Sequence, residues 1–143
     1  MKNEPVIIER VFDIPVEKVW NAITDKDQMK KWYFDIPDFK PELGHEFQFE
    51  AGAENKMYLH LCKITDVGPY QKLAHSWRYE GYEGNSHVTW ELFAESNKTR
   101  VKLIHEGLET FPTSNPDLAK QNFVAGWTDI VGSILPKFLE TAK

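Results

Sequence analysis

Residues 117–142 read DLAKQNFVAGWTDIVGSILPKFLETA. This segment predicts one long amphipathic helix over residues 117–142. Apolar side chains recur there every three or four residues, which is the period of one helix face. The side chains on this face are Ala119, Phe123, Gly126, Trp127, Ile130, Ile134 and Phe138, widened by Val124, Val131 and Leu135. Asn115 and Pro116 are typical of a helix start, and Pro136 predicts a kink in the last turns. Another layer of structure must cover so long an apolar face.

The middle of the chain predicts that covering layer, because its apolar period changes from about 3.6 to two at Gly44. Runs of alternating apolar and polar residues are separated by Gly, Pro and Asn, which favour turns. The expected strands cover residues 46–50, 57–67, 73–80, 88–94 and 101–105. Strands joined in sequence by short turns form an antiparallel sheet.

The N-terminal segment predicts one more strand and two short helices. Residues 6–12 have a strand-like composition, and Pro15 then favours a helix start. Asp25 followed three residues later by Gln28 resembles a capping box and predicts a second helix that ends near Trp32. The first strand is isolated in sequence, so it must join the later sheet to satisfy its backbone groups.

We therefore predict an α+β fold in a single domain spanning residues 1–143. A curved six-stranded antiparallel sheet wraps around the long C-terminal helix, with two short helices between strands one and two. A sheet of this size curls, and one helix in its concavity leaves space beside it. Five Trp, five Tyr and nine Phe make up 13% of the chain. We expect these rings to line an apolar cavity between the sheet and the C-terminal helix.

The side chains on the inward faces are the candidates for ligand contact. They are Trp32, Phe34, Phe47, Phe49, Trp77, Tyr79, Trp90, Leu103, His105, Phe123, Trp127 and Ile130. For any single one of them, burial in an ordinary core is the commoner role. As a set they favour a pocket, because ligand pockets are mostly apolar with a few polar groups.

No catalytic residue, metal site or other cofactor is predicted. His75 and His105 lie on apolar strand faces, where a neutral imidazole can act as a base or bind a ligand carbonyl. No nucleophile accompanies them at the spacing of a known catalytic motif. A buried histidine that is hydrogen-bonded within the core is therefore the commoner role. His60, His87 and Cys62 do not have the spacing of metal ligands.

Composition and charge exclude several classes of partner. The formal net charge is -5, and no basic cluster stands out against it, so neither nucleic acid nor an anionic membrane surface is expected. The single cysteine, Cys62, favours a reducing compartment. The sequence shows no apolar run of signal-peptide or transmembrane length. We expect a cytoplasmic protein.

Short motifs along almost the whole chain occur in one family's order and spacing. They are Pro15, Val16, Val19 and Trp20; residues 25–32; Asp66 to Pro69 before Leu73 and Trp77; His105 to Leu108; and Gly126 with Trp127. The chain resembles the SRPBCC or START-like helix-grip superfamily, in the branch homologous to the activator of the 90-kDa heat-shock-protein ATPase. The resemblance implies that the sheet grips the C-terminal helix. Many members hold an apolar ligand there, and catalytic residues are not shared.

Three functions are compatible with these observations. The first is binding of a small apolar molecule of unknown identity in the cavity, without an identified reaction. The second is a co-chaperone-like interaction with a heat-shock-protein ATPase, which the resemblance suggests. The third, less favoured, is a cyclase-like or hydrolase-like enzyme that uses the same cavity with His105 or Tyr79 as acid or base.

Overall fold

The computed structural model describes residues 4–37, 39–53, 56–112, 114–115 and 118–141. The elements follow one another in the predicted order of strand, two short helices, five strands and a C-terminal helical segment. They are β1 (Val6–Phe12), α1 (Val16–Thr24), α2 (Lys26–Trp32), β2 (Glu46–Ala53), β3 (Lys56–Gly68), β4 (Lys72–Tyr79), β5 (Ser86–Glu95), β6 (Lys98–Glu106), η1 (Leu108–Thr110), α3 (Lys120–Asp129), η3 (Ile130–Ile134) and α4 (Leu135–Thr141).

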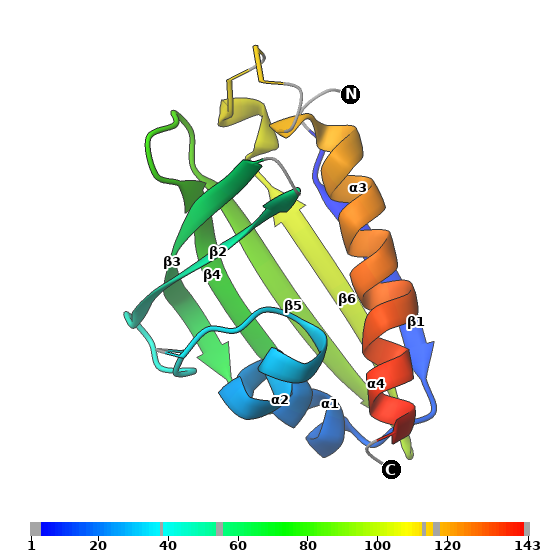
Figure 1. Ribbon diagram of the computed structural model, residues 1–143. Coiled ribbons are helices and arrows are strands. Elements are labelled where there is room, and N and C mark those ends of the chain that lie inside the picture. Colours follow the sequence, from blue (N-terminus) through cyan, green and yellow to red (C-terminus); the bar gives the residue numbers. More distant parts are fainter. Residues whose placement is uncertain (1–3, 38, 54–55, 113, 116–117, 142–143) are drawn as a thin grey trace.

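The described strands form one six-stranded antiparallel sheet in the order β1-β6-β5-β4-β3-β2. The first strand joins the sheet beside the last one, as its unpaired backbone required. The C-terminal helical segment runs along one face of the sheet, and α1 and α2 lie at one end of it (Figure 1). The predicted fold class is confirmed.

The alternation in the strands correctly predicts which side chains face the helix. In β4, Leu73, His75, Trp77 and Tyr79 are all buried. The same holds for Val88, Trp90 and Leu92 in β5 and for Val101, Leu103 and His105 in β6. Because these strands pair in register, their inward side chains form continuous rows that the helix covers.

The C-terminal helix begins later than predicted. Its first residue is Lys120, and the position before it is Ala119, which makes no side-chain cap. Asn115 is therefore not the cap; its carbonyl accepts a hydrogen bond from the Leu118 N–H in a preceding turn. Residues 116, 117 and 142, which the sequence also placed in or beside this helix, lie outside the described residues.

The buried stripe of this helix is narrower than the predicted one and includes Trp127, Val131 and Leu135 from it. Gly126, Val124 and Ile134 are exposed. The buried residues are Trp127, Val131, Leu135 and Leu139. A step of four residues turns an α-helix by more than one full turn, so such a stripe would drift around the helix axis.

A π-helical turn keeps that stripe facing the sheet. The segment η3 has the wider hydrogen-bonding pattern of a π-helix, which accommodates one extra residue and offsets the drift. Pro136 is the second residue of α4, which begins directly after η3, and Pro is tolerated in the first turn of a helix because its missing N–H is not needed there. The kink expected at Pro136 stays a prediction. No helix in the described part of the chain is both long and apolar enough to span a bilayer.

Candidate functional site

The structure brings the twelve candidate residues together on the inward side of the sheet and helix. Nine of them are buried in the core. The other three, Phe34, Phe123 and Ile130, are partly buried and pack against it. Sequence alternation thus located the interior correctly, and ligand contact by these residues stays a prediction.

Aromatic rings fill much of this interior by direct contact. Phe49 stacks on Phe34 with ring centroids 4.6 Å apart and on His60 at 4.5 Å. Trp127 of α3 contacts Trp77 at 5.6 Å and Trp90 at 5.9 Å. These separations are those of favourable stacked and edge-to-face pairs. The helix is therefore held to the sheet largely through tryptophan.

At the α2 end, the interior holds a cavity of about 10 Å³. It is lined by Ile23, Met29, Tyr33, Ile36, Phe39, Phe47, Phe49, Leu73, His75 and Trp90. This volume is at the lower limit of what one water molecule needs. The ligand-sized space expected from the sequence is not open between these residues. Of the twelve candidates, Phe47, Phe49 and Trp90 line the cavity.

Tyr33 is the polar residue of this cavity that the sequence did not single out. Its hydroxyl is buried and has no hydrogen-bond partner among the residues that the structure describes. Burial raises the pKa of Tyr33 well above its ordinary value, and the nearby Cys62 and Tyr79 raise it further. Buried hydroxyls are normally paired, so a single orphan marks a position where a partner is missing.

The position of Tyr33 follows from how α2 starts and stops. The Asp25 carboxylate accepts a hydrogen bond from the Asp27 N–H at 3.0 Å, which confirms Asp25 as the N-cap, although the predicted capping box would have used Gln28. The helix ends one residue before Tyr33, whose backbone leaves the helical region (φ -118°, ψ -111°). Neither the helical nor the strand period applies at such a residue. The sequence therefore contained no signal for its direction.

His75 is a second polar residue of the cavity. It is buried, and its Nδ1 lies 2.9 Å from the Ser76 carbonyl oxygen, which requires a proton on Nδ1. Burial lowers the pKa of His75 to about 4, so the ring is neutral at pH 7 and its Nε2 is an acceptor. The predicted core location is confirmed.

The other ionisable side chains of the interior are neutral for the same reason. Burial lowers the pKa of His60 to about 4, and its Nδ1 donates to the Tyr58 carbonyl at 3.0 Å. Burial raises the pKa of both Cys62 and Tyr79 far above the ordinary values. Among the described residues, no group of three His, Cys, Asp or Glu side chains lies close enough to hold a metal ion.

Hydrogen bonds occupy both ring nitrogens of His105. The Trp127 indole donates to Nδ1 at 2.9 Å, so Nε2 carries the proton and donates to the Ser86 hydroxyl at 2.7 Å. Ser86 in turn donates to the Trp77 carbonyl at 2.7 Å. Burial lowers the pKa of His105 to about 3. This chain of bonds ties α3 to three strands and leaves His105 no free nitrogen for acid or base chemistry.

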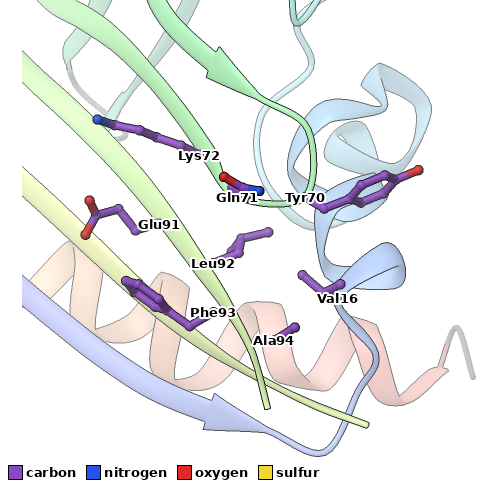
Figure 2. Close-up of a pocket in the computed structure, with 8 residues that line it drawn as sticks. All are labelled: Val16, Tyr70, Gln71, Lys72, Glu91, Leu92, Phe93 and Ala94. Atoms are coloured by element: carbon purple, nitrogen blue, oxygen red, sulfur yellow. The ribbon is translucent and has the colours of Figure 1, made fainter. Parts of the chain in front are cut away.

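A larger hollow of about 590 Å³ lies on the surface at one end of the sheet (Figure 2). Its walls come from the start of α1, the turn before β4 and the end of β5. In Figure 2 the Lys72 and Glu91 side chains extend to one side, and the Tyr70 hydroxyl points to the other. Lys72 is already paired with Asp66 at 3.2 Å. Ligand sites have polar groups that converge on one point, so the interior is the better candidate.

Comparison with known proteins agrees with this architecture. Residues 13–140 match the model of the family described as Activator of Hsp90 ATPase homolog 1-like protein. No curated protein sequence matches the chain.

Several solved structures share the fold. Protein MLL2253 from Mesorhizobium loti is 24% identical with a TM-score of 0.80, covering 98% of this chain and 99% of that one. DynU16, a protein of the dynemicin biosynthetic locus, is 23% identical with a TM-score of 0.78, covering 98% of this chain and 48% of that one, so this chain spans about half its length. CalU16 from Micromonospora echinospora is 25% identical with a TM-score of 0.71, covering 93% of this chain and 74% of that one.

Proposed function

The chain belongs to the family of Activator of Hsp90 ATPase homolog 1-like proteins, and we propose that it binds a small hydrophobic molecule in the interior on the inward face of the sheet, without an identified reaction. The cavity lies at the end covered by α2 and the connection after it, and no described residue of the C-terminal helix lines it. The observation that carries this proposal is the Tyr33 hydroxyl, which is buried in a ring-lined interior and has no hydrogen-bond partner in the described part of the chain. A core selected only for stability would have phenylalanine there. A polar group kept at this position is typical of a site that orients a ligand.

The composition of the interior supports an apolar occupant. Phe49 stacks on both Phe34 and His60, and Trp77 packs edge-on against Phe49 and against Trp127, so the walls are largely aromatic. Burial keeps the histidines neutral, so the walls present no full charge to the occupant. A molecule that buries apolar area against these rings would gain about 25 cal/mol for each Å² removed from water.

Entry of a ligand requires some side chains to move, because the cavity in the closed protein holds about 10 Å³. Ile36 and Phe39 are the wall residues best placed to do so. They are buried on the connection between α2 and β2, which is neither helix nor strand where it is described. Phe39 rests edge-on against Phe47 with centroids 5.0 Å apart. Withdrawal of this connection would open a space bounded by Tyr33 and His75.

Two measurements test the binding proposal. Native mass spectrometry of the protein as purified should show an additional small mass, lost under denaturing conditions. Calorimetric titration with 2-naphthol should show binding that is at least tenfold tighter in Phe39→Ala, because this truncation opens space beforehand. The control is Ile7→Ala, which truncates a side chain that is 50% exposed. Absence of any bound mass, together with no heat of binding in either Phe39→Ala or the parent, would contradict the proposal.

The family match favours one alternative, a protein partner of the heat-shock ATPase class. In that case the tagged chain should retain the chaperone at micromolar concentrations, with the interior remaining closed. If the chaperone is still retained by the Phe39→Ala variant but is lost when the charge of a surface residue is reversed, the protein-partner function would be favoured over ligand binding. Finding no association at micromolar concentration would remove this alternative.

A further inference from the structure

We propose that the molecule bound in the interior is uncharged and carries one hydrogen-bonding oxygen, which the Tyr33 hydroxyl holds. This inference rests on the proposed function and narrows it to a chemical class: flat neutral compounds with a phenol or ketone oxygen. It adds Tyr33 to the site as the residue that determines which ligands are accepted.

The first step is that the Tyr33 hydroxyl makes no hydrogen bond within the described residues, whereas the other polar side chains discussed above each make at least one. His105 is bonded through both ring nitrogens, and the Tyr79 hydroxyl accepts a hydrogen bond from the Trp77 indole at 2.9 Å. His60 donates to a backbone carbonyl. The Tyr33 hydroxyl can both donate and accept, and it does neither within the described residues. One available hydroxyl supports one polar contact with a ligand.

The second step is that the lining contains no charged group to pair with a charged ligand. Its ten residues include no Asp, Glu, Lys or Arg. The lining histidine, His75, is buried and already donates from Nδ1 to the Ser76 carbonyl. A carboxylate or ammonium group brought into this interior would lose its hydration without compensation. Charged analogues of an accepted ligand should therefore be rejected.

The third step concerns discrimination among neutral ligands. A site with a buried hydroxyl disfavours an analogue without the matching oxygen, because the protein group then stays unpaired. Phenylalanine at position 33 has no such group and should accept both analogues equally. The preference for the oxygen, rather than binding itself, is therefore the property that reports on Tyr33.

The experiment compares three naphthalene probes in the Phe39→Ala background by calorimetry: 2-naphthol, 2-methylnaphthalene and 2-naphthoate. We expect 2-naphthol to bind about tenfold more tightly than 2-methylnaphthalene, and 2-naphthoate to show no binding at pH 7. Adding Tyr33→Phe should bring the ratio of the two neutral probes close to one. The matched control is Tyr70→Phe, because the Tyr70 side chain is 48% exposed; it should leave the ratio at about ten. If Phe39→Ala does not fold, Phe39→Leu takes its place.

The outcomes separate the two proposals. If no probe binds either background, the proposed function itself fails. If the two neutral probes bind equally well before Tyr33 is changed, binding stands and the role of Tyr33 is overturned. Tight binding of 2-naphthoate would overturn the requirement for a neutral ligand. A ratio near ten that persists in Tyr33→Phe would assign the preference to another polar group.

Discussion

The buried Tyr33 hydroxyl lowers the stability of the protein, and in the proposed function it provides a hydrogen-bonding group for the ligand. A buried hydroxyl without a partner costs about 1–3 kcal/mol relative to one that is paired or hydrated. The rings of Trp32 and Phe34 lie 5.0 and 4.4 Å from the Tyr33 ring, so its aromatic part is well packed. The cost therefore falls on the hydroxyl alone, and a variant can remove it without disturbing the packing.

Tyr33→Phe should raise the free energy of unfolding of the ligand-free protein by about 1 kcal/mol, because it removes a buried group for which the described residues supply no partner. Urea denaturation of the parent and the variant measures this difference. Tyr70→Phe is the control and should change stability by less than about 0.5 kcal/mol, since its side chain is largely exposed. A loss of stability in Tyr33→Phe would show that the hydroxyl is satisfied in solution.

The buried histidines predict how stability depends on pH. The unfolded chain protonates them near pH 6.5, whereas the native chain keeps them neutral down to about pH 4 for His60 and His75 and about pH 3 for His105. The stability they confer is complete above pH 6.5 and is lost as pH falls below that value. Between pH 6.5 and 5.5 the free energy of unfolding should fall by about 1 kcal/mol for each histidine.

Denaturation series at these two pH values measure that loss, which should total about 3 kcal/mol for the three histidines. In His105→Gln the loss should be smaller by about 1 kcal/mol, since one titrating group is gone. Its stability at pH 7.5 should also fall, because the Trp127 indole and the Ser86 hydroxyl lose their shared partner. Equal pH dependence in the two proteins would show that His105 protonates in the native state as easily as in the unfolded one.

At the scale of elements, the strands were predictable and the ends of the helices were less so. Alternation is a local property, and the sheet buries one face along its whole length, so the inward residues of β4, β5 and β6 could be read directly. Which residues of the C-terminal helix are buried could be predicted only in part. Trp127, Val131 and Leu135 of the predicted face are buried on either side of and within the π turn, whereas Gly126, in α3 before that turn, is exposed.

Replacement by alanine should change stability in opposite directions at Gly126 and Gly107. A Cβ at Gly126 would meet no atom within 4 Å, so Gly126→Ala should stabilise the protein by about 0.5–1 kcal/mol through helix propensity. Gly107 has a φ of +84°, and a Cβ there would lie 3.0 Å from the Asn85 carbonyl oxygen. Gly107→Ala should therefore cost about 1–2 kcal/mol. Thermal or urea unfolding of both variants measures these changes, and destabilisation by Gly126→Ala would show that position 126 has no room for a Cβ in solution.

At the candidate site, too, the residues in regular strands could be predicted from the sequence, and those in the connection after α2 could not. Alternation placed Phe47, Phe49 and Trp90 at the cavity, because all three lie in regular strands. The contribution of the connection after α2 depends on how Tyr33 leaves the helix, and no periodic pattern reports that angle. The small volume of the cavity could not be predicted from the sequence either. Side-chain patterns identify which residues face inward, but they do not show how tightly those residues fill the space.

At the scale of the whole molecule, a closed interior implies that opening precedes binding. The binding-competent state is a minor one when the cavity of the dominant state holds about 10 Å³. Ligand affinity is then reduced by the populated fraction of the open state, and the observed association rate levels off at the opening rate. Truncating a wall residue raises that fraction at the expense of core packing.

Stopped-flow mixing with 2-naphthol, followed by tryptophan fluorescence, should therefore give a rate that saturates with concentration in the parent protein and rises linearly in Phe39→Ala. The same truncation should lower the free energy of unfolding by about 3–5 kcal/mol, because it removes a buried phenylalanine. Ile7→Ala, on an exposed side chain, should leave the saturating behaviour intact. A linear dependence in the parent would mean that the interior is already open in solution, whereas saturation in both proteins would place the opening step in a part of the wall other than Phe39.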